Sequence, residues 1–165
     1  MSPVERDSLP AWQQQPPVED IYSNLTDDYG GRETLAIIVR NEFNNPGHNF
    51  FTDSNRSQQL GFIKLPTKYK IEPHVHNSLP REVRITNEVL VIKKGILRVD
   101  LYNEHRGYVT SRELFPGDVI LLISGGHGFE VVEDVEMIEV RQGPYSAGRD
   151  KTRFKGTSSG EVRYG

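Results

Sequence analysis

The sequence contains no cysteine among its 165 residues. Disulfides, thiolate nucleophiles and cysteine-based zinc sites are therefore excluded, and any metal ion must be held by histidine and carboxylate side chains. No hydrophobic run approaches the roughly 20 residues of a transmembrane helix. Residues 1–19 also lack the basic start and apolar stretch of a signal peptide. We therefore expect a cytoplasmic protein with no membrane partner.

A strong excess of one charge sign is also missing. The chain has 20 Lys and Arg against 23 Asp and Glu, a formal net charge of -3. Nucleic acids and anionic membranes reward a large basic surplus, so neither is expected as a partner. A small-molecule ligand is the expected partner instead.

Length and local composition predict one folded domain with two irregular ends. Residues 1–30 are rich in Pro, Gln and Asp, which predicts an extended N-terminal arm because proline fixes φ and removes a donor. This arm is either disordered or packed across a partner subunit. Residues 31–148 are predicted to form a β-barrel, and residues 149–165 a flexible polar tail.

Short β-rich runs separated by turn residues dominate the middle of the chain, and no stretch keeps a helical apolar period over three turns. Regularly spaced short strands predict an all-β sandwich or barrel. One hairpin is predicted around Gly95, which can adopt positive φ, and a second around 103–107. The predicted strands are 35–39, 59–64, 69–76, 83–93, 96–102, 119–123, 128–132 and 137–141.

The sharpest local pattern is the pair His74 and His76, two residues apart in a predicted strand. Side chains at this spacing point to the same face, so both imidazoles can bind one first-row metal ion. The alternative is a pair of ordinary surface or core histidines.

Two further residues extend this pattern. Glu88 shares a strand face with Leu90 and Ile92, so it points into an apolar interior if they do, where a carboxylate must be paired or bound to metal. The alternative places Glu88 in solvent at the frayed start of the strand. His127 lies between glycines that leave space around its ring. His48 and His105 occupy turn-rich segments and are expected to be solvated.

Residues 61–140 resemble a cupin, an all-β double-stranded β-helix or jelly-roll barrel. The HxH pair, the segment 88–95 with Glu and Gly separated by six residues, the Pro-Gly turn at 116–117 and the following His127 carry the resemblance. The chain departs from the family pattern in the longer spacing between His76 and Glu88, and in His127 arriving one residue early.

The resemblance implies that His74, His76, Glu88 and His127 bind one divalent transition metal. Fe, Mn, Ni, Co and Zn all suit three imidazoles and one carboxylate. Glu82 is a competing carboxylate, but it lacks the glycine that follows Glu88. Arg84 shares the predicted face of Glu88 and is a candidate clamp for an anionic substrate, the alternative being a solvated side chain.

Several functions stay open at this point. The leading interpretation is a metal-dependent enzyme of isomerase or dioxygenase type that acts on a sugar or carboxylate, as in cupins of surface-polysaccharide sugar metabolism. No catalytic residue can be named. The alternatives are a sugar- or metal-binding module without turnover and a purely structural cupin. A homodimer that exchanges the strand around 34–39 is also expected.

Overall fold

The computed structural model describes residues 15–26, 32–144, 146 and 148–164. Residues 1–14 and 27–30 of the predicted N-terminal arm therefore lie outside the described residues. The chain divides into two units, one formed by residues up to Phe43 together with those from Thr86 onward, and one formed by Asn44–Ile85. Each unit is described by itself.

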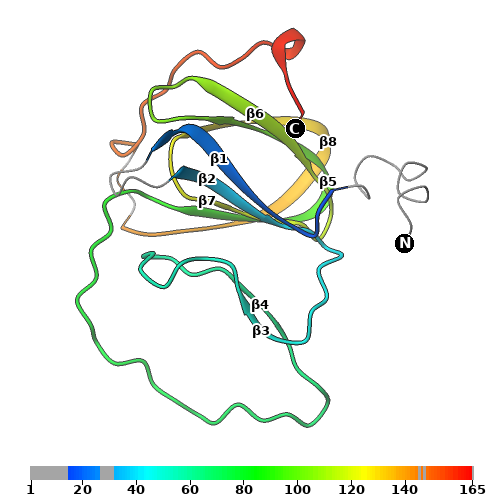
Figure 1. Ribbon diagram of the computed structural model, residues 1–165, viewed down its shortest axis with the longest axis vertical. Helices are drawn as coiled ribbons and strands as arrows, with labels where there is room; N and C mark the ends of the chain where they lie inside the picture. Colours follow the sequence, from blue (N-terminus) through cyan, green and yellow to red (C-terminus); the bar gives the residue numbers. More distant parts are fainter. Residues whose placement is uncertain (1–14, 27–31, 145, 147, 165) are drawn as a thin grey trace. The chain divides into compact units, whose positions relative to one another are not determined.

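The first unit is one curled antiparallel sheet, whose strands bend around a shared interior (Figure 1). The predicted all-β class is thereby confirmed, and no helix in the described ranges is long and apolar enough to cross a membrane. The strands are β1 (Val18–Thr26), β2 (Arg32–Val39), β5 (Glu88–Tyr102), β6 (Tyr108–Leu114), β7 (Val119–Leu122) and β8 (Gly126–Arg141).

The long strand β5 organises this sheet. Its first residues pair with β7, its last residues pair with β6, and β8 follows it along its whole length. The predicted hairpin at Gly95 is wrong, because β5 continues through this residue. Gly95 has a φ of 76°, and its pairing with β8 is irregular there. A side chain at this position would collide with the backbone carbonyl of Asp134, so the glycine permits close approach of two strands instead of a chain reversal. The second predicted hairpin, around 103–107, is confirmed.

The core fills the interior of the curled sheet. Alternate residues of β5 enter it, while the short strands β2 and β7 are buried along almost their whole length. Such nearly continuous burial explains why both read as apolar runs in the sequence. The buried cluster consists of Ile21, Leu35, Ala36, Ile38, Leu90, Ile92, Leu97, Val99, Leu101, Leu114, Ile120 and Leu122.

A buried ion pair holds the turn between β6 and β7. Gly117 has a φ of 93°, which lets the chain reverse at the predicted Pro-Gly turn. The Asp118 carboxylate then accepts hydrogen bonds from Arg40 Nη1 at 2.8 Å and from the backbone nitrogens of Phe115 and Asn41, each at 3.0 Å. This carboxylate therefore ties the turn to the chain that follows β2.

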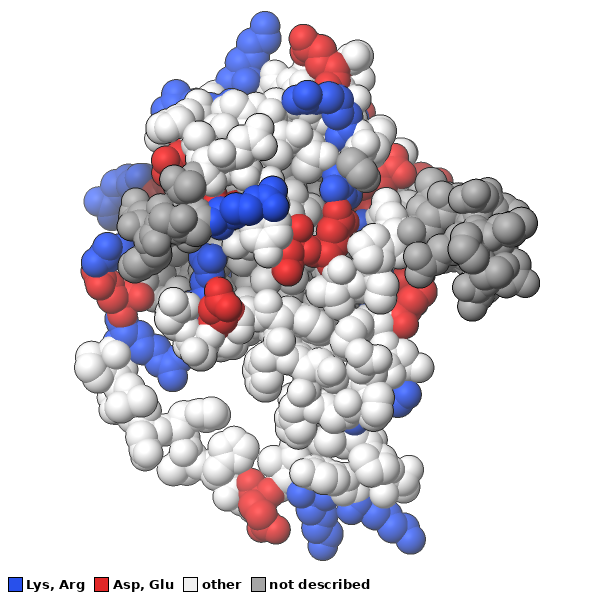
Figure 2. Space-filling view, viewed as in Figure 1, with Lys and Arg blue, Asp and Glu red and all other residues white. Residues whose placement is uncertain are grey.

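The other charged side chains either alternate in sign over the surface or form ion pairs within the sheet. Acidic and basic side chains are interspersed over the face seen in Figure 2, without a large area of one sign. Within the sheet, Arg98 donates to both carboxylate oxygens of Asp100, at 2.9 and 3.1 Å, and it also lies 2.7 Å from a Glu130 oxygen. Two parallel hydrogen bonds of this kind are the strong form of an arginine–carboxylate contact.

The second unit contains one antiparallel hairpin, formed by β3 (Gly47–Phe50) and β4 (Gly61–Lys64). The predicted strand at 69–76 is wrong, since residues 65–87 form no strand. Pro66, Pro73 and Pro80 interrupt this stretch, and a proline cannot donate to a strand ladder. The strand predicted to start at 83 begins only at Glu88.

The C-terminal segment runs back over the sheet beside β6 (Figure 1). The backbone nitrogen of Ser111 donates to Arg163 O at 2.9 Å, and Ser111 forms an isolated parallel bridge with Tyr164. The Phe154 ring packs edge-on against Tyr102, with centroids 5.1 Å apart. A short 3₁₀ turn, η1 (Ser159–Glu161), lies between these contacts. Residues of the predicted tail thus contribute to the structure of the first unit.

Candidate functional site

Glu88 is the first residue of β5 and lies on its buried face. Strand alternation places it on the same side as Leu90 and Ile92, which are each 1 % exposed. Only 6 % of the Glu88 side chain is accessible. The sequence predicts that Glu88 points into the interior if Leu90 and Ile92 do, and this condition is met. A carboxylate in such a place requires a partner.

His127 is the partner that β8 brings to this carboxylate. It is the second residue of β8, between Gly126 and Gly128, and its Nε2 atom lies 3.2 Å from Glu88 Oε2. The ring remains partly accessible, with 27 % of the side chain exposed. The structure thus brings together two of the four predicted ligands, from residues that are far apart in the sequence.

Two cations that the sequence reasoning missed complete this cluster. Lys151 Nζ donates to Glu88 Oε1 at 2.9 Å, and Arg141 Nη1 lies 3.7 Å from the same oxygen. Arg141 is the cross-strand partner of Glu88, so its position follows once the β5–β8 register is known. Nothing in the sequence indicates Lys151, because its segment contains no strand pattern. We call Glu88, His127, Arg141 and Lys151 the Glu88 cluster.

Burial and charge set the protonation states of this pair. Burial opposes ionisation of Glu88, but the Lys151 hydrogen bond and the surrounding positive charges outweigh it and lower the pKa of Glu88. Burial also lowers the pKa of His127, against the opposing influence of the Glu88 charge. The imidazole is therefore neutral near pH 7, and the ionised Glu88 is stabilised chiefly by the hydrogen bond from Lys151. A neutral imidazole and an ionised carboxylate are the forms that bind metal ions.

The spacing of the two donor atoms fits a shared metal ion. Two ligands at about 2.1 Å from one ion, with bond angles between octahedral and tetrahedral values, lie about 3.0–3.4 Å apart. The Nε2–Oε2 distance is 3.2 Å. However, no group of three or more His, Asp or Glu side chains arranged to hold a metal ion occurs within the described ranges. The Glu88 cluster itself supplies two donors of the required chemistry.

The other two predicted ligands belong to the second unit. His74 and His76 are exposed, and their rings meet edge-on with centroids 5.3 Å apart. His74 Nδ1 lies 3.0 Å from the backbone oxygen of Glu72. A carbonyl oxygen can only accept a hydrogen bond, so this contact places the proton on Nδ1 of His74. The lone pair of Nε2 is then available to bind a metal ion. Their segment is not the predicted strand, but the two imidazoles do lie together.

The remaining candidates are solvent-exposed. Arg84 Nε lies 2.9 Å from Glu82 Oε1, and both side chains are 73 % exposed. In this arrangement Glu82 neutralises the predicted anion clamp. His48 and His105 are also exposed, in agreement with the prediction.

Comparisons with known proteins add no identification. No protein-family model matches the chain, and no curated protein or solved structure matches it either.

Proposed function

We propose that this chain is a metal-binding protein with a cupin-like jelly-roll barrel, and that it acts on a small polar molecule such as a sugar or a carboxylate. One divalent transition metal is bound through Glu88 and His127, joined by His74 and His76. The part played by His74 and His76 is inferred from the sequence resemblance alone.

The observation that supports this proposal is the buried contact between Glu88 and His127. A carboxylate with 6 % exposure lies 3.2 Å from an imidazole nitrogen at a partly accessible position. Simple packing favours apolar side chains at such a place, since a buried charge costs stability unless it is compensated. An acid and an imidazole placed together in such a site favour a chemical role.

The residues of the Glu88 cluster have distinct roles in this proposal. Glu88 supplies the negative charge and His127 a neutral nitrogen, Arg141 holds the carboxylate in position, and Lys151 competes with the metal ion for it. A bound metal ion would supply Lewis acidity, which polarises a carbonyl or an alcohol oxygen. Lys151 is half exposed and lies against Glu88, so it can leave the carboxylate and meet an anionic group of the substrate.

A second candidate is a binding protein without turnover. The observation that favours it is the charge balance around Glu88, where Lys151 and Arg141 already compensate the carboxylate. In that case the ionic cluster stabilises the sheet, and the barrel holds a ligand without changing it.

Cobalt titration distinguishes a metal site from a purely ionic cluster. Co²⁺ added to the metal-free protein is expected to give visible d–d absorption that saturates at one equivalent. Glu88→Gln and His127→Gln are expected to abolish this signal, whereas the exposed control His105→Gln leaves it intact. Saturable absorption that survives both site variants would overturn the assignment, and so would no absorption in the parent. Turnover of sugars or keto acids by the loaded protein then separates an enzyme from a binding module.

A further inference from the structure

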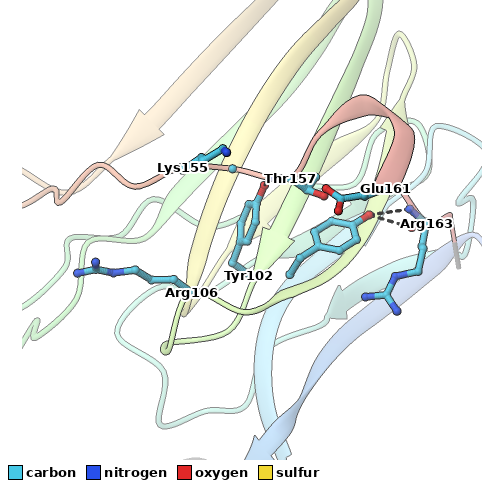
Figure 3. Close-up of a pocket in the computed structure, with 8 residues that line it drawn as sticks. Tyr102, Arg106, Lys155, Thr157, Glu161 and Arg163 are labelled. Atoms are coloured by element: carbon cyan, nitrogen blue, oxygen red, sulfur yellow. Dashed lines mark hydrogen bonds between the residues drawn. The ribbon is translucent and has the colours of Figure 1, made fainter.

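A cavity lies on the opposite face of the sheet from the Glu88 cluster. Its volume is about 450 Å³, and it is an open pocket lined by the end of the β5–β6 hairpin and by the C-terminal segment (Figure 3). Leu101 pairs with His127 and Tyr102 pairs with Gly126. Because side chains alternate along a strand, Tyr102 points away from the face that carries His127. The cavity, here called the tyrosine pocket, is therefore separate from the proposed metal site.

Hydrogen bonds from two tyrosines fasten the wall of this pocket. Tyr102 Oη accepts from the backbone nitrogen of Thr157 at 2.9 Å, and Tyr108 Oη accepts from the backbone nitrogen of Arg163 at 2.8 Å. The Phe154 ring packs against Tyr102 next to the first contact. The C-terminal segment is thus attached on both sides of η1, and the pocket is a built feature of the fold.

The charge of the tyrosine pocket is strongly positive for a chain whose formal net charge is -3. Arg106, Lys155 and Arg163 line it, and none of them forms an ion pair in the described part of the chain. The single acid in the lining, Glu161, is occupied by Ser158, whose hydroxyl donates to it at 2.6 Å. By contrast, the cations of the Glu88 cluster are all paired with carboxylates.

Aromatic rings hold the two arginines without consuming their donors. The Arg163 guanidinium carbon lies 5.3 Å from the Tyr108 ring centroid, and that of Arg106 lies 5.8 Å from the Phe154 centroid. Cation–π contacts of this kind position a guanidinium while its N–H groups stay available. Figure 3 shows Arg106 and Arg163 on opposite sides of Tyr102, with Lys155 near the hydroxyl end of this ring.

We infer that the tyrosine pocket binds a small organic phosphate, with the phosphate group held by Lys155 and Arg163, Arg106 adding positive charge, and the organic part placed against Tyr108. Guanidinium forks match the oxygen geometry of phosphate. Three cations and one ionised carboxylate leave the lining with two excess positive charges, which favours a dianion. The volume of about 450 Å³ falls within the range of ligand pockets, which is about 300–1,000 Å³. It therefore leaves room for an organic moiety beside the phosphate.

Calorimetric titration with adenosine 5′-monophosphate tests this inference on the full chain. The probe joins a dianionic phosphate to a ring that can stack on tyrosine. We expect saturable binding at one site that weakens as salt is raised. Lys155→Gln and Arg163→Gln are each expected to weaken it about tenfold, the effect of losing one charge-assisted hydrogen bond. The matched control Lys94→Gln removes one exposed positive charge outside the pocket and should leave the affinity unchanged.

Three results would overturn the inference. They are no binding at millimolar adenosine 5′-monophosphate, a loss of affinity in Lys94→Gln as large as in the pocket variants, and an affinity for inorganic phosphate equal to that for the probe. The last result would show that the organic part of the ligand contributes nothing. Amide resonances of the unsubstituted protein give a second readout that does not depend on any variant folding. The probe is expected to shift the Thr157 and Arg163 signals. Shifts confined to other parts of the sheet would place the ligand elsewhere and contradict the assignment.

Discussion

Replacing Asp118 with alanine tests how the sheet is held together. The Asp118 side chain is 3 % exposed and pairs with Arg40, whose own side chain is 2 % exposed. The substitution removes this ion pair together with the two backbone hydrogen bonds from Phe115 and Asn41. Arg40 Nη1 keeps the Glu113 carbonyl as a partner, and Nη2 still lies 3.7 Å from Glu19 Oε2, but the guanidinium loses its nearest carboxylate. Removing one partner of a buried ion pair costs about 3–5 kcal/mol.

For a domain of this size, each kcal/mol changes Tm by about 2–4 °C, so Asp118→Ala should lower Tm by about 6–20 °C. Urea unfolding followed by circular dichroism gives the free energy directly. The control Glu136→Gln breaks a 3.9 Å contact between side chains that are 65 % exposed, and it should cost less than about 1 kcal/mol. The double variant Arg40→Met, Asp118→Leu is expected to recover much of the loss, because neither charge is then left alone. A loss below about 1 kcal/mol in Asp118→Ala would refute this reasoning.

Three further perturbations follow from the same contacts. Gly95→Ala, at a φ of 76° and against Asp134, should cost roughly 1–3 kcal/mol in urea unfolding, whereas Gly160→Ala, which meets open space, should not. Lys151→Met removes the hydrogen bond to the Glu88 carboxylate and should tighten Co²⁺ binding about fivefold in a competition titration. Unchanged or weaker Co²⁺ binding would show that Lys151 does not compete with the metal ion. Because the pKa of His127 is lowered from 6.5, the unfolded chain gains a proton first, so the free energy of unfolding should fall as the pH drops below about 6.5, and His127→Gln should flatten that part of the profile. The pKa of Glu88 is lowered from 4.5, so its contribution should be lost as the pH falls below that value, and Glu88→Gln should remove this loss.

Local patterns predicted much of the first unit. The apolar run that became β2, the Pro-Gly turn before β7 and the alternation of Glu88 with Leu90 and Ile92 all reflect short-range rules. They hold because each strand buries one or both faces against neighbours of the same sheet.

The misses came from long-range geometry. Gly95 does adopt positive φ, but whether such a residue reverses the chain or permits a close approach depends on β8, which is remote in sequence. The strand predicted around His74 needs a pairing partner that local composition cannot supply. Lys151 was missed for the same reason, since its role comes only from its contact with Glu88.

Metal content tests the central claim most directly. Elemental analysis of protein purified without a metal-chelating tag should be done beside the double variant His74→Ala, His127→Ala. The account predicts about one transition metal ion per chain in the parent and none in the variant, with both proteins folded by circular dichroism. A parent that contains no metal, even after incubation with Fe, Mn, Co, Ni or Zn salts, would contradict the account.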